Sequence, residues 1–346
     1  MGRVDVNNRL RAAAAAAAAA ALAAGLAACS PEEPDGHDRS GKHYYVSLGD
    51  SLAVGVQPTA DGGLEETRDG YTDVLYRRLY DRDSTLEHRR MGCGGEDTTT
   101  FVEGGTDLCE GRYAEESQLA AAERFLGRHR DRVDLVTVGI GANNFTGCVL
   151  DAVEGAEGTE GAGAEPSAGS GVVTGLDGID RDCVADGLER LEAELPVIAR
   201  RLRGAAGPDT RIVGMTYYNP FLAALLLEDA GAAGAGPGTG GADGAAGAEP
   251  RRSEAVDYAT GVFEDMNRVI TDAYTAEDIA VADVAGAFAS GDTSVPAGSE
   301  TGMPANVERV CDHTWMCNLA VGPDIHTNPA GAALIADAFE AELGRP

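Results

Sequence analysis

Short apolar runs alternate with longer amphipathic segments along most of the chain. The apolar runs are bounded by turn residues and predict strands at residues 44–48, 86–91, 133–140, 211–217 and 279–281. The segments between them predict helices at residues 71–80, 115–128, 184–202, 254–274 and 329–343. Because strands that alternate with helices form right-handed βαβ units, we predict an α/β fold whose parallel sheet is covered on both faces.

Two stretches interrupt this alternation. Residues 153–178 and 229–250 are rich in Gly, Ala and Glu and contain almost no large apolar side chain. This composition indicates flexible surface insertions, and a substrate lid is the less favoured alternative because neither stretch is amphipathic. We therefore expect one domain over residues 43–346.

The first 28 residues have the pattern of an export signal. Three Arg residues precede an apolar run, mostly Ala, at residues 12–28. Ala is barely apolar on insertion scales, so a cleaved signal is favoured over a permanent membrane span. Leu-Ala-Ala-Cys at residues 26–29 resembles a bacterial lipobox, which implies that Cys29 is acylated. The alternative is an ordinary cleavage site that contains a Cys, and in either case residues 29–42 are expected to form a flexible tether.

Charge narrows the choice of partners. The 346 residues carry a formal net charge of −30, so the chain lacks the basic face that a nucleic-acid binder needs. The same charge repels anionic lipid headgroups. We expect a monomer that is exported, either as a cell-surface lipoprotein or as a secreted protein, and that reaches a membrane only through its lipid anchor.

Six of the seven cysteines remain when Cys29 is set aside. An even number in an exported chain indicates disulfides. We favour pairing between nearest neighbours along the chain, which gives Cys93–Cys109, Cys148–Cys183 and Cys311–Cys317. A zinc site is disfavoured because the spacings do not form CxxC knuckles, and we expect neither a metal nor an organic cofactor.

A candidate nucleophile follows the first predicted strand. Residues 44–48 run directly into Gly49-Asp50-Ser51-Leu52. In an open parallel sheet, ligands bind outside the carboxyl ends of the strands, so Ser51 lies where a nucleophile would be placed. The alternative is that this Asp-Ser pair only caps the next helix.

Gly49-Asp50-Ser51-Leu52 resembles the first block of the SGNH, or GDSL, family of esterases and lipases, and the resemblance suggests a lipoprotein member of actinobacterial type. Residues 91–99 are similar to the second block, and we align Gly95 with the glycine whose N–H helps to form the oxyanion hole. Residues 136–144 are similar to the third block, G-x-N-D, with Asn143 as the oxyanion amide. Asn144 replaces the usual Asp, which puts a supporting contact in doubt.

The segment 322–328 resembles the fifth block, which implies that His326 is the base. The usual spacing is D-x-x-H, whereas here Asp324 precedes His326 by two positions and Pro323 precedes it by three. The group that orients the imidazole is therefore either the Asp324 side chain, which we favour, or a main-chain oxygen of Pro323 or Asp324. His313 is the competing candidate for the base.

The resemblance, from about residue 44 to residue 343, implies a three-layer α/β/α sandwich with a parallel five-stranded, flavodoxin-like sheet. The chemistry of the residues agrees, because an imidazole can take the proton of a serine hydroxyl and return it to the leaving alcohol. The N–H groups of Ser51 and Gly95 and the Asn143 amide would stabilise the oxyanion.

We therefore predict a carboxylic ester hydrolase, an esterase or lipase, that acts on a small-molecule or lipid ester. A carbohydrate acetylesterase would use the same residues. The rival from another class is a catalytically silent surface lipoprotein that binds lipid or glycan in the same cleft.

The remaining aromatic and histidine residues have weaker signals. We expect three histidines, His43, His88 and His129, to be solvated at the surface. Residues 217–221 could line the acyl side of the cleft or the edge of the core, and Trp315 could border the cleft.

Overall fold

The computed structural model describes residues 41–113, 117–145, 148, 179–220, 245–318 and 320–344. In residues 245–253, 255 and 256 it describes the backbone only. The chain divides into two units, Met1–Gly41 and Lys42–Pro346, and every element named below belongs to the second. The expected signal segment, Cys29 and the insertion at residues 153–178 lie outside the described residues.

A single five-stranded sheet organises the second unit, in the order β4-β1-β5-β6-β7. All neighbouring strands are parallel, which confirms the predicted α/β fold. The strands are β1 (His43–Gly49), β4 (Leu86–Arg90), β5 (Val133–Gly139), β6 (Arg211–Met215) and β7 (Ala280–Ala282). The central strands are apolar along nearly their whole length because helices cover both faces.

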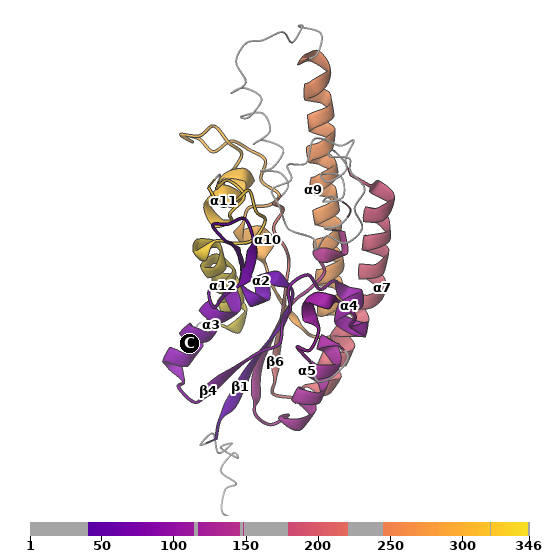
Figure 1. Cartoon of the computed structure of the whole chain (residues 1–346), viewed down its shortest axis with the longest axis vertical. Helices are drawn as coiled ribbons and strands as arrows, with labels where there is room; N and C mark the ends of the chain where they lie inside the picture. The colour runs from indigo at the N-terminus through magenta and orange to yellow at the C-terminus, as the bar shows by residue number, and fades with distance from the viewer. Residues whose placement is uncertain are drawn as a thin grey trace, which may run out of the picture. The chain divides into compact units, whose positions relative to one another are not determined.

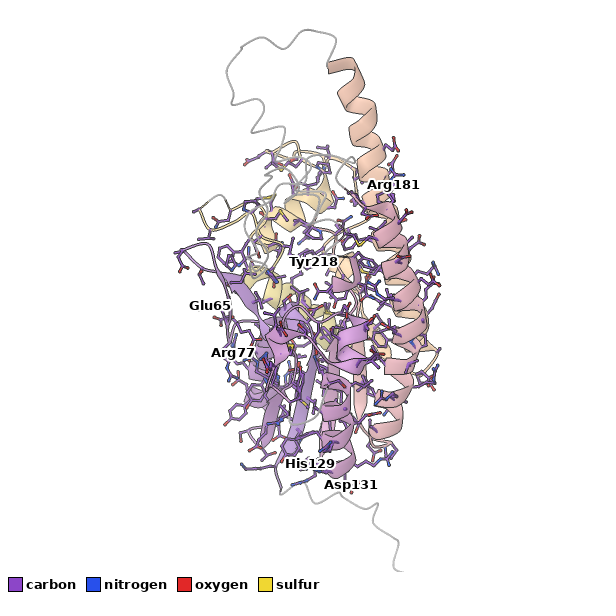
Figure 2. The ribbon with its side chains drawn as sticks, turned by 45° about the vertical axis from the view of Figure 1, so that its right-hand side comes forward. Glu65, Arg77, His129, Asp131, Arg181 and Tyr218 are labelled. Atoms are coloured by element: carbon purple, nitrogen blue, oxygen red, sulfur yellow. A yellow bond between two sulfur atoms is a disulfide. The ribbon has the colours of Figure 1, made fainter. Side chains whose placement is uncertain are left out.

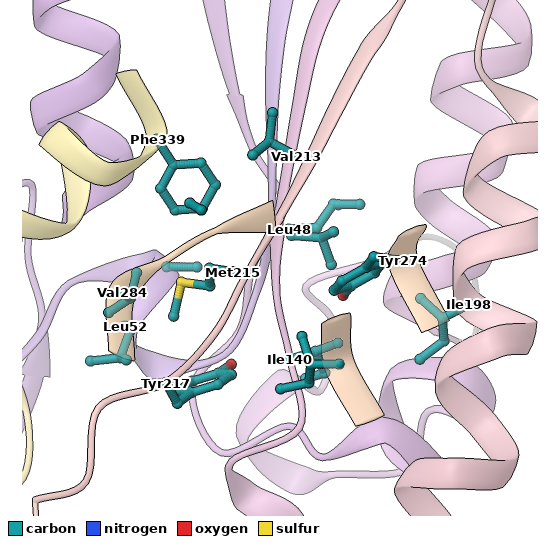
Figure 3. Packing of buried hydrophobic residues seen from close by; sticks show 14 of the residues in the cluster. Leu48, Leu52, Ile140, Ile198, Val213, Met215, Tyr217, Tyr274, Val284 and Phe339 are labelled. Carbon is teal, nitrogen blue, oxygen red and sulfur yellow. The ribbon is translucent and has the colours of Figure 1, made fainter. Parts of the chain in front are cut away.

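Helices form the two outer layers (Figure 1). One face carries α3 (Tyr71–Arg82) and α12 (Pro329–Leu343), and the other carries α5 (Gln118–Arg128), α7 (Arg181–Ala205) and α9 (Ala245–Thr275). Figure 3 shows the result, with Phe339 on one side of the strands and Tyr274 and Ile198 on the other. All three side chains are fully buried.

Of the second expected insertion, residues 229–250, the part at residues 229–244 lies outside the described residues, and the prediction is wrong for residues 245–250. Helix α9 begins at Ala245, so residues 245–250 have helical backbone. Ala and Glu are strong helix formers, and the bias toward these residues that indicated an insertion also extends the helix.

Several short elements were not predicted. They are α2 (Ser51–Val54), the antiparallel pair β2 (Val56–Pro58) and β3 (Leu64–Glu66), α4 (Thr98–Glu103), the 3₁₀ turn η1 (Asp107–Cys109), α10 (Val284–Ala287) and α11 (Ala305–His313). Most are too short for a hydrophobic period to be visible. They follow strands or precede the last helix, and α2, α4, α10 and α11 lie toward one end of the sheet in Figure 1.

Two of the three histidines expected at the surface, His43 and His88, have largely enclosed side chains, which are 10% and 6% exposed. As a whole residue His43 is 8% exposed, and its ring contacts Asp134 through Nδ1 and Asp83 Oδ2 through Nε2 at 3.0 Å. Strand β1 begins beside two carboxylates, that of Asp83 just after α3 and that of Asp134 in β5, which accounts for this error. The third, His129, is partly exposed, and Figure 2 shows it near Asp131, at the opposite end of the sheet from Tyr218.

His88 was the second error. Its ring stacks between Tyr45 and Tyr76, with centroids 4.6 and 4.9 Å away, and its Nε2 lies 2.9 Å from Ser47 Oγ. Burial, together with the nearby arginines, lowers the pKa of His88 to about 3, so the ring is neutral in the folded chain.

The six cysteines pair as predicted. The disulfides are Cys93–Cys109, Cys148–Cys183 and Cys311–Cys317. Each crosslinks a segment that follows a strand or precedes the last helix.

Over the described part of the chain, no helix has the length and apolar character to cross a membrane. Among the same residues, no cluster of three or more His, Cys, Asp or Glu side chains is arranged to hold a metal ion.

We expect Gly49→Ala to destabilise the fold by about 3 kcal/mol or more. Gly49 has a φ of +132°, and a Cβ there would lie 2.1 Å from the Gly139 carbonyl oxygen. Gly127→Ala is the control, because a Cβ at this helical position meets nothing within 4 Å and should stabilise α5 by up to about 1 kcal/mol. Urea unfolding measures both, and equal midpoints for the two variants would contradict the prediction.

Candidate active site

Ser51 is the first residue of helix α2, directly after the turn that ends β1. Asp50 caps this helix, and its Oδ1 accepts from Leu52 N at 3.0 Å. The main-chain N of Asp50 donates to Gly139 O at 3.1 Å, which ties the turn to β5. The capping alternative is therefore correct for Asp50, while Ser51 itself remains partly exposed at the carboxyl end of the sheet.

The second predicted block lies beside Ser51. Cys93 N donates to Gly49 O at 2.9 Å, so the loop after β4 follows the end of β1. A Cβ on Gly94 would come within 3.9 Å of Ser51 Cβ. Gly95 then has a φ of +78°, the left-handed conformation that glycine adopts without strain.

The third block contributes two asparagines with different surroundings. Asn143 Nδ2 donates to Glu96 O at 2.9 Å, which brings the predicted oxyanion amide to the Gly95 loop. Asn144 is buried, accepts from Thr98 N at 3.1 Å and donates to Thr98 Oγ1 at 2.7 Å. Asn144 thus supports the start of α4, and an ionised Asp could not make the second of these bonds.

The acid and the imidazole of the fifth block are in direct contact. Asp324 Oδ1 accepts from His326 N at 2.9 Å and lies 2.8 Å from His326 Nδ1. Burial opposes the charge of Asp324, but its hydrogen bonds and charge interaction with His326 lower the pKa of Asp324 below its usual range. The two-residue spacing is therefore sufficient for the carboxylate to reach Nδ1.

The loop that carries His326 is held by its neighbours. Trp315 N donates to His326 O at 3.0 Å, and Asp324 N donates to Trp315 O at 3.3 Å. Tyr218 OH donates to Ile325 O at 2.6 Å. Trp315 also lines a cavity of about 680 Å³ together with the Cys311–Cys317 disulfide, so it borders a hollow next to this loop.

The competing base is engaged elsewhere. His313 Nδ1 lies 2.9 Å from the carbonyl oxygen of Arg309, within its own helix α11. Its ring packs edge-on against Phe288 at 5.7 Å. His326, and not His313, has the carboxylate partner.

Sequence reasoning missed the partner of Asp50. Tyr217 OH donates to Asp50 Oδ2 at 2.6 Å. Burial raises the pKa of Asp50 to about 6, while the bonds from Tyr217 and Leu52 and the charge interaction with His326 oppose the rise. His326 is thus close enough to influence the residue that precedes Ser51. Tyr217 and Tyr218 are 2% and 4% exposed, which favours the core-edge interpretation over an acyl-lining one.

A second missed group is Gln118, the first residue of α5. Its Oε1 accepts from Gly49 N at 2.7 Å and its Nε2 donates to Gly49 O at 3.1 Å. The same Nε2 donates to the carboxylate of Glu96, and both side chains are completely buried. The sequence shows only a Gln in the first turn of the helix predicted at residues 115–128, and its burial, which reveals the contact, is known only from the structure.

The model of the GDSL-like Lipase/Acylhydrolase family matches residues 47–334, and the chain belongs to that family. Similar solved structures include an extracellular lipase from Streptomyces rimosus, with 15% identity over 86% of this chain and 99% of that chain and a TM-score of 0.49. They also include phospholipase A1 from Streptomyces albidoflavus NA297, with 16% identity over 87% of this chain and 99% of that chain and a TM-score of 0.43. Est24, a carbohydrate acetylesterase from Sinorhizobium meliloti, has 12% identity over 87% of this chain and 98% of that chain and a TM-score of 0.38. A comparison with curated proteins found no match.

We expect Tyr217→Phe to cost about 1–3 kcal/mol of stability at about pH 8 and much less at about pH 4. Burial raises the folded-state pKa of Asp50 to about 6. The contribution of Asp50 to folding stability is therefore full below its ordinary pKa, where the carboxyl is uncharged, and is lost as the pH rises through about 6. Losing the Tyr217 hydroxyl raises that pKa further, so the variant suffers most where Asp50 must be charged.

Tyr218→Phe is the matched control for this measurement. Its hydroxyl donates to a main-chain oxygen, that of Ile325, so its cost should be independent of pH. Urea unfolding at both pH values measures the loss of stability in each variant. An equal change of this loss with pH in the two variants would contradict the role given to Asp50.

Proposed function

We propose that this chain hydrolyses carboxylic esters through an acyl-enzyme formed on Ser51. The observation that carries the proposal is the contact of 2.8 Å between Asp324 Oδ1 and His326 Nδ1 in a member of an acylhydrolase family. A carboxylate at Nδ1 favours the tautomer with the proton on Nδ1. Nε2 then has a lone pair with which to accept the serine proton.

The reaction divides into acylation and deacylation. Ser51 Oγ attacks the ester carbonyl carbon while His326 Nε2 takes its proton. The imidazolium, stabilised by Asp324, then gives the proton to the leaving alcohol as the carbon–oxygen bond of the ester breaks. Water repeats the sequence on the acyl-enzyme, releases the carboxylic acid and restores Ser51.

Three donors would stabilise the oxyanion of each tetrahedral intermediate. They are the N–H of Ser51, the N–H of Gly95 and the Asn143 side-chain amide. The position of Gly94 beside Ser51, where an added Cβ would lie 3.9 Å from Ser51 Cβ, and the bond from Asn143 Nδ2 to Glu96 O support this assignment. Removing one such donor typically lowers kcat by about 10²–10³.

The proposed setting is outside the cytoplasm. Three disulfides in the described residues support export to an oxidising compartment. With Cys29 acylated, the enzyme would be tethered to a membrane, where esters of lipids are at hand.

Ser51→Ala should abolish labelling by a fluorophosphonate probe and lower ester hydrolysis by roughly 10⁴–10⁶. His326→Ala should lower both by about 10³ or more, since the hydroxyl loses its base. The labelling rate and the hydrolysis of p-nitrophenyl esters measure these effects. Ser84→Ala, at an exposed turn before β4, is the control and should react as the unsubstituted chain does.

Two further results, one on the parent chain and one on the additional variant Asp324→Asn, have a definite meaning. An unlabelled parent chain would favour the silent surface lipoprotein that binds lipid or glycan. Asp324→Asn with nearly full activity would favour a main-chain oxygen as the group that orients His326.

The acyl-chain dependence of hydrolysis tests the substrate class. We expect esters of medium and long acyl chains to be hydrolysed at least about tenfold faster than acetate, because a lipid-ester enzyme uses acyl binding energy to lower its barrier. A p-nitrophenyl ester series from two to sixteen carbons measures the profile. A maximum at acetate would instead identify a carbohydrate-type acetylesterase.

A further inference from the structure

Glu96 is a buried acid that the proposed reaction does not use. It follows Gly95, and its side chain has no exposed surface. One carboxyl oxygen, Oε2, accepts from Gln118, while Oε1 has no hydrogen-bond partner among the described residues. Burying a carboxyl group with incomplete hydrogen bonding is costly, so its presence beside the candidate oxyanion donors needs a reason.

The main chain of Glu96 contacts one of these donors. Its carbonyl oxygen accepts from Asn143 Nδ2 at 2.9 Å. An amide nitrogen carries two hydrogens in one plane, so this bond determines the direction of the second hydrogen. The peptide unit before Glu96 contains the N–H of Glu96 and the carbonyl of Gly95, so a shift of Glu96 would move Gly95 as well.

The side chain of Glu96 contacts the Ser51 turn through Gln118. The Gln118 amide pairs with both main-chain groups of Gly49, at 2.7 and 3.1 Å. Only one orientation of this amide gives the Gly49 N–H an acceptor, and the Glu96 carboxyl accepts from the amide in that orientation. Glu96 therefore favours the arrangement that holds the turn two residues before Ser51.

We propose that Glu96 is a positioning residue of the oxyanion hole, which aligns Asn143 through its main chain and the Ser51 turn through Gln118. The inference rests on the proposed function, since it assumes that these groups stabilise an oxyanion. It assigns to one buried residue, through its main chain and its side chain together, the mutual alignment of donors from three separate strand ends.

The charge of Glu96 gives the proposal a second consequence. Burial raises the pKa of Glu96 to about 7, the Gln118 bond and the charge of Arg112 oppose the rise, and Asp50 and Asp97 add to it. Tyr113 is a further titratable side chain that interacts with Glu96, and burial raises its own pKa. An uncharged Glu96 adds no repulsion to a developing oxyanion, whereas an ionised one does.

The experiment compares Glu96→Ala, Glu96→Gln and Asp97→Ala in the full chain, with a p-nitrophenyl ester that the parent chain hydrolyses. At about pH 6, Glu96→Ala should lose tenfold or more in kcat with KM changed less than about twofold, because the effect lies in the transition state. Glu96→Gln should retain kcat within about threefold, since its amide oxygen can accept from Gln118. Above about pH 8 the ratio of its kcat to that of the parent should rise several-fold.

Asp97→Ala separates a positioning role from a loss of stability. Asp97 is the adjacent acid and caps α4, where its Oδ1 accepts from Thr100 N at 2.8 Å. Its loss should lower the melting temperature, as a lost cap does, while kcat stays within about twofold of the parent.

Three results would overturn the inference. They are a kcat of Glu96→Ala equal to that of Asp97→Ala, a Glu96→Gln variant as impaired as Glu96→Ala, and a flat kcat ratio between about pH 6 and about pH 9. Should Glu96→Ala not fold, the pH dependence of Glu96→Gln decides alone. If the parent chain is active and is labelled by fluorophosphonate, a negative result overturns only the role given to Glu96. If the parent chain is inactive and unlabelled, the proposed function and this inference are overturned together.

Discussion

The turn after β1 passes so close to β5 that no side chain fits at Gly49, where a Cβ would lie 2.1 Å from Gly139 O. This close approach lets Asp50 N donate to Gly139 O at 3.1 Å, so helix α2 starts at a fixed point against the central strands. Since Ser51 is the first residue of that helix, its position depends on a backbone contact between two strands. The candidate oxyanion and imidazole loops can then be arranged around a stationary hydroxyl.

Two long-range contacts keep this turn in place. Tyr217 binds the Asp50 side chain, and Gln118 satisfies both main-chain groups of Gly49. These contacts give buried polar groups of the turn a hydrogen-bond partner. Each such group without a partner would weaken the fold by about 1–3 kcal/mol. The candidate site is therefore supported by the segment that follows β6 and by the first residue of α5, and the short α2 does not need intrinsic stability of its own.

Sequence reasoning predicted the sheet because strands such as β5 are covered on both faces and are therefore mostly apolar. It also predicted the pairing of Asp324 with His326, because these two residues are only two positions apart in the sequence. It failed for contacts that depend on tertiary structure. The Tyr217–Asp50 bond joins residues 167 positions apart, and the burial of His88 requires knowledge that Tyr45 and Tyr76 enclose it.

Three buried carboxyl groups surround the candidate site, and their partners determine which of them carries charge. Asp324 interacts with the imidazole of His326, and its pKa is lowered despite burial. Asp50 and Glu96 have neutral hydroxyl or amide donors, and burial raises their pKa values to about 6 and about 7. Neutral donors compensate less for lost hydration than an ion pair does. Negative charge is thus most favourable beside His326, where the proposed reaction forms an imidazolium, and least favourable at Glu96, where it would oppose the proposed oxyanion.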